Sequence, residues 1–119
     1  MFRDQLVNIS LSFKEPCHKL MQTIYMINER NGFWDDGNDR NVGEMIALIH
    51  SELSEALEGH RKQKQDDHLP QYSSLEVELA DTIIRIFDMA YGLDLNILDP
   101  LFEKVAYNQS RPHKHGKNY

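Results

Sequence analysis

The sequence is poor in cysteine and has no long apolar run. A single cysteine, Cys17, stands among 119 residues, so no disulfide can form within the chain and a reducing compartment is its natural environment. No stretch approaches the roughly 18 apolar residues that a membrane-spanning helix requires. The opening segment, MFRDQLVNISLSFKEP, also lacks the continuous apolar core of a signal peptide. We therefore expect a cytoplasmic protein with no membrane partner.

Basic residues are scarce over most of the chain and concentrated at its end. Residues 1–103 hold 9 Lys and Arg against 19 Asp and Glu, whereas residues 104–119 hold 4 basic residues and no carboxylate. An acidic body argues against a nucleic-acid polymer as partner, because proteins that bind such polymers present a basic face. The basic end suits a small polyphosphate that arrives with a metal ion, or it is simply a solvated tail.

Proline and glycine are also sparse, with 4 and 6 residues, and they separate segments of helical periodicity. Apolar residues recur at helical spacing in four segments: 17–31, 42–60, 75–91 and about 99–110. At 119 residues the chain is long enough for one domain around a single core. We predict an all-α four-helix bundle. Residues 1–15 alternate like a strand yet also share a helical face, so periodicity leaves their conformation open.

Short motifs predict where the helices begin. Pro16 suits the first turn of the first helix, where its missing N–H costs nothing. Asn41 with Glu44, and Ser73 with Glu76, have the spacing of capping boxes for the second and third helices. The last helix has three candidate caps, Asp94, Asn96 and Asp99. The third of these is favoured because a proline follows it, and proline is tolerated only in a first turn.

The segment 75–91 is apolar around most of its circumference, which is typical of a helix buried at the centre of a protein. Only one narrow polar strip remains on it: Glu78, Asp81, Arg85 and Asp88. This strip therefore faces either solvent or a functional site.

Two acidic pairs at helical spacing are the main functional signal. Glu52–Glu55 and Glu78–Asp81 each form an E-x-x-[E/D] step, and residues three apart are neighbours on a helix surface. Packed side by side, the two helices would gather four carboxylates. At an effective dielectric of about 20, two like charges about 4 Å apart repel by about 4 kcal/mol, so such a patch needs a cation, a proton or water. Hard oxygen ligands suit Mg²⁺, with Mn²⁺ as a second possibility.

Glu52 distinguishes this pattern from an ordinary solvated helix face. At about 100° per residue it falls between Leu48 and Met45, on the apolar side of its helix. A carboxylate in that position needs a partner, because burying it unpaired is very unfavourable. One acidic pair alone is usually a solvated surface feature. The two pairs together favour a site.

A polar stripe on the last helix adds to this reading. Lys104, Asn108 and Arg111 lie at i, i+4 and i+7, within about 60° of one another on a helix. Two cations and an amide in line are suited to holding phosphate oxygens. Trp34, the only tryptophan, is a candidate either for stacking on a nucleobase or for ordinary packing.

These residues resemble a known family. The segments HSELSEALEG, ELADTIIRIFDMA and EKVAYNQSRPHKHGK are similar to the MazG-like all-α nucleoside triphosphate pyrophosphohydrolases, whose signature is E-x-x-E, a variable gap and E-x-x-D, followed by a helix with lysine, asparagine and a basic end. The resemblance covers roughly residues 17–117. It implies a domain over 17–119 with an extension at 1–16. Arg85 departs from members that carry an aromatic residue one turn after the aspartate.

The resemblance implies a function. Mg²⁺ would be bound by four carboxylates, Glu52, Glu55, Glu78 and Asp81. A (deoxy)nucleoside triphosphate would be hydrolysed to the monophosphate and pyrophosphate, and Glu52 or Glu55 would activate the water. Lys104, Asn108 and Arg111 would hold the triphosphate, and Trp34 would lie near the base. Members usually form homodimers or homotetramers, and clearing unwanted nucleotides is the implied purpose.

Two alternatives remain open. A narrower relative, acting on dUTP, dCTP or phosphoribosyl-ATP, would share the acidic pattern and differ in the base pocket. A non-catalytic helical module would use its apolar helices for oligomerisation or partner binding.

Overall fold

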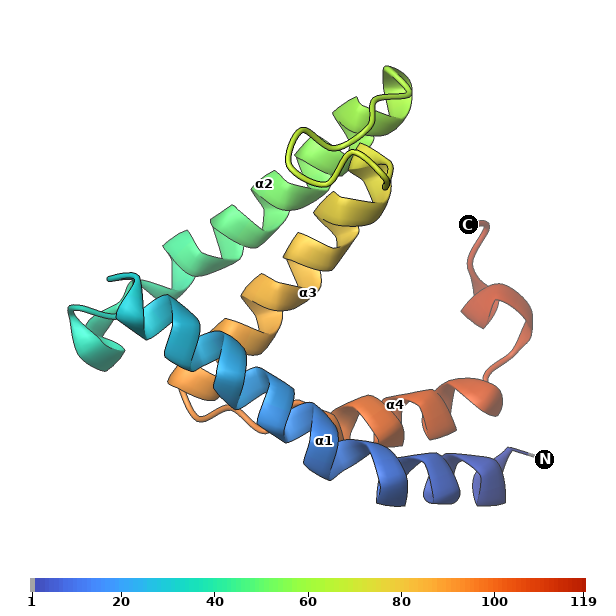
Figure 1. The fold of residues 1–119 in the computed structure, drawn as a ribbon. Coiled ribbons are helices and arrows are strands. Elements are labelled where there is room, and N and C mark those ends of the chain that lie inside the picture. The colour runs from blue at the N-terminus through green and yellow to red at the C-terminus, as the bar shows by residue number, and fades with distance from the viewer. Residues whose placement is uncertain (1) are drawn as a thin grey trace.

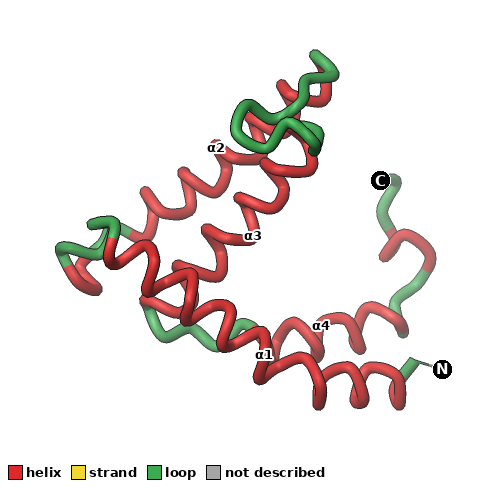
Figure 2. The backbone as a smooth tube through the Cα atoms, in the orientation of Figure 1, coloured by secondary structure: helices red, strands yellow, loops and turns green. Residues whose placement is uncertain are grey.

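The computed structural model describes residues 2–119, and within them the fold is all helical (Figures 1 and 2). The chain forms four α-helices: α1 (Arg3–Arg30), α2 (Val42–Arg61), α3 (Ser74–Gly92) and α4 (Leu98–Gln109). Short 3₁₀ turns, Gly37–Asp39 and His113–Gly116, lie before α2 and after α4. The prediction of an all-α fold with four helices is confirmed. None of the described helices is long and apolar enough to cross a membrane.

The first helix begins earlier than the sequence predicted. Residues 3–15 are helical and continuous with the rest of α1, so Pro16 lies inside the helix and not in its first turn. Packing against α4 accounts for the difference. Phe13 meets Phe102 of α4 edge to face, with ring centroids 5.9 Å apart, and Lys14 pairs with Asp99. These contacts favour the helical conformation of residues 3–15, which periodicity left open. They also offset the cost of an interior proline.

The helices α2 and α3 lie side by side as an antiparallel hairpin (Figure 1). Both begin where the capping motifs predicted. The Asn41 side chain accepts a hydrogen bond from the backbone N–H of Glu44 at 2.9 Å, and Ser73 with Glu76 forms a complete, reciprocal capping box. Where α2 ends and α3 begins, a Cβ on Gly59 would overlap the Ser74 side chain. Glycine therefore allows the two helices to approach closely there.

The last helix begins before the favoured cap. Its N-cap position is Ile97, whose side chain makes no capping hydrogen bond, and one residue earlier Asn96 Oδ1 accepts from the backbone N–H of Asp99. Asp99 instead lies in the first turn, where its carboxylate pairs with Lys14 and accepts from the Asn96 amide. A carboxylate is also favoured there by the helix dipole. The preference for Asp99 as cap was wrong.

The hydrophobic core lies where α1, α3 and the start of α4 meet. It is built from Cys17 and Met21 of α1, Ala90 of α3 and Leu98 of α4, with aromatic and aliphatic side chains packed around them. Cys17 is buried, as the sequence indicated. In Figure 1 this junction is the corner from which the α2–α3 hairpin and the α1–α4 pair extend in different directions.

Central burial of α3 does not occur within the single chain. Leu79, Ile83 and Ile86 are 45%, 52% and 38% exposed, although the sequence predicted a helix buried nearly all round. The same holds for part of the apolar arc of α2, where Leu57 is 59% exposed. The helices form as predicted, but one apolar face of the hairpin contacts no other part of the described chain closely enough to be buried.

Candidate metal centre

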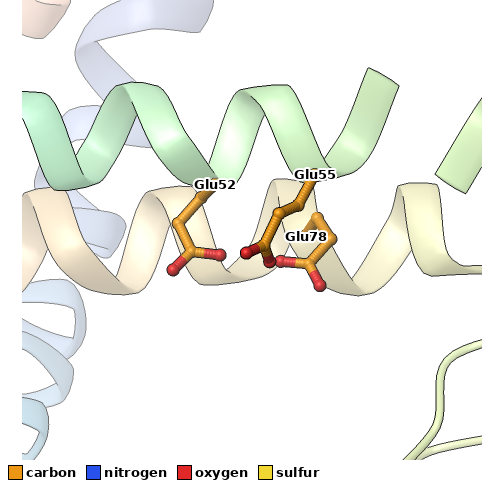
Figure 3. Close-up of side chains that lie close together, drawn as sticks. All are labelled: Glu52, Glu55 and Glu78. Atoms are coloured by element: carbon orange, nitrogen blue, oxygen red, sulfur yellow. The ribbon is translucent and has the colours of Figure 1, made fainter. Parts of the chain in front are cut away.

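Three of the four predicted carboxylates come together between α2 and α3. Glu52, Glu55 and Glu78 each offer an oxygen within 4.8 Å of the others. Figure 3 shows Glu52 and Glu55 descending from α2 and Glu78 approaching from α3, all on the same side of the hairpin. The i, i+3 spacing places the first two on one face, and the antiparallel packing brings the third opposite them.

Glu78 is the most strongly perturbed member of this cluster. Burial is the largest of the effects that raise its pKa. The hydrogen bond with Glu52 and the negative charges of Glu55, Glu52 and Asp81 raise the pKa further, to about 8. Its Oε2 atom is buried and accepts no hydrogen bond from the described residues. At neutral pH, Glu78 therefore holds a proton, because a third negative charge between its neighbours would be too costly.

Glu52 is the ionised partner in the cluster. It is 9% exposed, and its Oε1 accepts a hydrogen bond from Arg85 Nε at 2.7 Å. Burial by itself raises the pKa of Glu52, but the hydrogen bond from Glu78 and the Arg85 guanidinium outweigh this, so the pKa is lowered. Arg85 comes from the polar strip of α3, and it supplies the positive charge that the buried carboxylate requires. Glu55, by contrast, is exposed.

Asp81 lies beside the three carboxylates and outside their tightest grouping. Burial raises its pKa first, and the charges of Glu52 and Asp66 raise it further. Together with Glu52 and Arg85, it lines a cavity of about 270 Å³. The remaining lining residues are Asn28, Phe33, Arg40, Ile84 and Asp88.

A second cavity, of about 220 Å³, opens on the other side of the cluster. Glu55 and Glu78 line it together with the connection between α2 and α3, which contributes Lys62, Lys64 and Asp66. The connection is held in shape by Asp66 Oδ2, which accepts backbone hydrogen bonds from two of the residues that follow it. Three carboxylates and two arginines line the first cavity, and five carboxylates and two lysines line the second.

Trp34 is packed into the structure. It is 4% exposed, and its Nε1 donates to Asp88 Oδ1 at 2.9 Å. The Arg40 guanidinium lies 4.6 Å from the indole ring centroid, and the ring also contacts Tyr25 and covers Gly92 so closely that a Cβ there would overlap it. These contacts give Trp34 and Asp88 a structural role beside the cavity that contains Glu52 and Asp81.

The residues predicted to hold phosphate are not brought to the carboxylates within one chain. Lys104 and Asn108 lie on α4, with Arg111 just beyond its end, and none of them lines either cavity beside the cluster. The Lys104 ammonium and the Arg111 guanidinium both lie over the ring of Tyr107, at 4.7 and 5.5 Å. Asn108 Oδ1 is buried without a hydrogen-bond partner.

Sequence reasoning missed several residues that border the cluster. Phe33 is 60% exposed and lines the cavity that contains Glu52 and Asp81. Lys64 and Asp66 face Glu55 and Glu78 from the connecting segment. These residues belong to irregular segments, where periodicity carries no information. The only available signal was composition: an aromatic residue next to Trp34, the candidate for stacking on a base, and a charged loop between the two acidic helices.

The donor chemistry of the cluster suits a hard divalent cation. Glu52, Glu55 and Glu78 supply carboxylate oxygens, the ligand type that Mg²⁺ and Mn²⁺ prefer. The partnerless Glu78 Oε2 is a buried acceptor that such an ion would satisfy. Binding requires Glu78 to release its proton, because a ligating carboxylate is deprotonated.

Comparison of the chain with known protein families, curated proteins and solved structures found no match.

Proposed function

We propose that this protein is a Mg²⁺-dependent nucleoside triphosphate pyrophosphohydrolase of the MazG-like kind. The observation that carries the proposal is the convergence of Glu52 and Glu55 of α2 with Glu78 of α3 to within 4.8 Å. The single buried cysteine suits a reducing environment, and we place the activity in the cytoplasm, in the clearance of unwanted nucleotides.

Glu52, Glu55 and Glu78 would hold the ion, with Asp81 as the fourth carboxylate at its side. Mg²⁺, or Mn²⁺ in its place, would supply positive charge to the phosphate oxygens and acidify a coordinated water. Glu52 is fixed by Arg85, which favours a ligating and orienting role. Glu55 is exposed and close enough to the cluster to accept a proton from the attacking water. Attack at the α-phosphorus would break the α–β linkage and release pyrophosphate.

Nearby side chains are suited to holding the rest of the substrate. Lys62 and Lys64 line the cavity next to Glu55 and Glu78, and ammonium groups there would attract the polyphosphate. Phe33 is the exposed aromatic at the other cavity, where it could stack on a base. Lys104, Asn108 and Arg111 remain a predicted phosphate-binding stripe, and they would act only where α4 is brought to a carboxylate cluster.

A nucleotide panel tests the proposal. Pyrophosphate release from ribo- and deoxynucleoside triphosphates would be measured with Mg²⁺ and again with a chelator. We expect Mg²⁺-dependent release that is lost in both Glu52→Gln and Glu55→Gln. Glu44→Gln, an exposed change in the first turn of the same helix, is the matched control and should keep full turnover. Release from no nucleotide, or unchanged turnover in Glu52→Gln, would exclude the assignment.

The same experiment separates the narrower substrates. Selective hydrolysis of dUTP, dCTP or phosphoribosyl-ATP would identify the corresponding specialised enzyme. A non-catalytic helical module is the second candidate, and the exposed apolar face of α2 and α3 is the observation that favours it. Nucleotide with Mg²⁺ at about 100 times its Kd should stabilise an enzyme by about 2.7 kcal/mol. A non-catalytic module should show no such shift.

A further inference from the structure

Arg85 keeps most of its hydrogen-bonding capacity free beside the carboxylate cluster. Its Nε donates to Glu52 Oε1 at 2.7 Å, and this is its only hydrogen bond within residues 2–119. A guanidinium carries several further N–H donors in a planar fork. The side chain is 38% exposed and lines the cavity that also contains Glu52 and Asp81. The remaining donors are therefore accessible to a molecule that enters this cavity.

The second guanidinium of this cavity is already committed to the fold. Arg40 Nη1 lies 3.7 Å from Asp88 Oδ2, and the Arg40 side chain is only 18% exposed. Its guanidinium also lies 4.6 Å from the ring centroid of the buried Trp34. A movement of Arg40 towards a ligand would give up both contacts. Among the described residues that line the cavity, Arg85 is thus the cation best placed to bind an anion.

Glu52 belongs both to the carboxylate cluster and to this cavity. Its partner Arg85 therefore lies at the boundary between the two. Phe33, an exposed aromatic side chain, lines the same cavity. A nucleotide with its phosphates at the cluster and its base at Phe33 would pass the free donors of Arg85. This position favours contact with the phosphate that joins the sugar.

A negatively charged substrate needs such a cation here. Glu55 and Asp81 add negative charge around Glu52, and a polyphosphate with one divalent ion bound still carries net negative charge, so the two would repel. A guanidinium binds phosphate through paired N–H···O bonds that are stronger than neutral hydrogen bonds. A phosphate that takes Arg85 from Glu52 leaves this carboxylate free to bind a divalent ion. By linkage, an ion on Glu52 leaves Arg85 available to the phosphate.

We propose that Arg85 gives up its hydrogen bond to Glu52 and binds a phosphate group of the substrate, so that the polyphosphate and the divalent ion bind cooperatively. The nucleotide nature of the substrate rests on the function proposed above, whereas the exchange requires only a polyphosphate and a divalent cation. The family resemblance does not supply this role, because Arg85 departs from the members that carry an aromatic residue at this position. The alternative roles for Arg85 are a fixed counter-ion of Glu52 and a simple competitor of the metal.

Calorimetry with Mg²⁺ and inorganic triphosphate tests the exchange, since this probe carries the phosphates without a base. Mg²⁺ is titrated alone into the unmodified protein and into Arg85→Gln, and triphosphate is then titrated at saturating Mg²⁺. Arg85→Gln should bind Mg²⁺ alone about fivefold more tightly, because Glu52 has lost its competing partner. The same variant should bind triphosphate about tenfold more weakly, because it lacks a charge-assisted pair with phosphate.

Two further variants serve as controls. Arg3→Gln makes the same change at the exposed first residue of α1, outside both cavities beside the cluster, and should bind both ligands as the unmodified protein does. Arg85→Lys keeps the charge without the planar fork, so its affinity for triphosphate should lie between those of Arg85→Gln and the unmodified protein. If Arg85→Gln does not fold, Arg85→Lys decides the question, and unchanged affinity for triphosphate would overturn the proposal.

Opposite shifts for the two ligands distinguish the exchange from the alternatives. If Arg85 is a fixed counter-ion, Arg85→Gln should lose affinity for both ligands. If Arg85 only competes with the metal, the variant should bind Mg²⁺ more tightly and triphosphate as before. Either result would overturn the proposal, as would the absence of triphosphate binding by the unmodified protein. Failure of the proposed function would look different, because the opposite shifts would be present while no nucleotide was hydrolysed.

Discussion

Arg85 of α3 donates from its Nε to Oε1 of Glu52 at 2.7 Å. The cluster's most buried carboxylate is therefore already paired with a cation that the protein supplies itself. This pairing makes Glu52 tolerable in a position where an unpaired charge would be very unfavourable. It also means that a divalent ion must share Glu52 with Arg85, or displace it.

Arg85→Gln should therefore weaken the protein without metal and strengthen its response to metal. We expect a loss of about 1–3 kcal/mol of unfolding free energy in a chelator, since Glu52 loses a charged hydrogen-bond donor. Mg²⁺ should restore more stability to this variant than to the unmodified protein. Urea unfolding with and without Mg²⁺ measures both effects. Lys19→Gln, which breaks an exposed pair with Glu15 on α1, is the control and should change stability little. Equal losses in the two variants would contradict this account.

The raised pKa of Glu78 predicts how stability depends on pH. Its pKa is about 8, against an ordinary value of 4.5, so the folded protein binds a proton that the unfolded chain has released. The unfolding free energy should therefore fall as pH rises from about 4.5 to about 8. Above that pH, Glu78 should cause no further decrease. Asp81, whose pKa is also raised, acts in the same direction, and Glu52, whose pKa is lowered, acts in the opposite one.

Glu78→Gln isolates this contribution, because the glutamine does not titrate. The difference in unfolding free energy between the unmodified protein and this variant should change steadily over that pH window. Metal binding by the unmodified protein should also strengthen towards pH 8 and release a proton, which calorimetry in buffers of different ionisation enthalpy detects. A difference that stays flat from pH 5 to about pH 8 would show that Glu78 is ionised throughout.

Gly92 makes room for the indole ring of Trp34 at the end of α3. It is the last residue of α3, and a Cβ there would overlap the indole ring of Trp34. Gly92→Ala should cost about 1–3 kcal/mol through overpacking, even though alanine is the better helix former. Ala80→Gly, at an exposed position of the same helix, should also cost up to about 1 kcal/mol, from propensity alone. Thermal unfolding compares the two, and a stabilising Gly92→Ala would contradict the close contact.

The parts of the fold that were predictable from sequence are those that local interactions specify. Asn41 and Ser73 cap helices through contacts three residues away, so their signals are readable in the chain. The conformation of residues 3–15 was not readable, since contacts such as Phe13 with Phe102 join segments far apart in sequence. The cap of α4 was assigned to Asp99 because a proline follows it, whereas α4 begins at Leu98 and the backbone N–H of Asp99 donates to the Asn96 side chain.

In the candidate site, too, local spacing was predictable from the sequence and contacts between helices were not. Helical spacing placed Glu52 and Glu55 on one face of α2, but the approach of Glu78 depends on α3 packing against that face. The partner of Glu52 depends on how α3 is rotated against α2, which periodicity does not determine, and so the ion pair with Arg85 was unforeseen. The apolar arc of α2 was read correctly as a pattern, but the sequence did not reveal that part of it stays exposed in the single chain.

Phe33 and Trp34 separate substrate contact from structural support at adjacent positions. Trp34 is buried and hydrogen-bonded to Asp88, so Trp34→Ala should cost about 3–5 kcal/mol of stability. Phe33 is 60% exposed and lines the cavity that contains Glu52 and Asp81, so Phe33→Ala should change stability by no more than about 0.5 kcal/mol. If Phe33 stacks on the base, its removal should raise KM with little change in kcat. Steady-state kinetics and thermal unfolding on both variants measure the two roles, and an unchanged KM in Phe33→Ala would leave base contact to another residue.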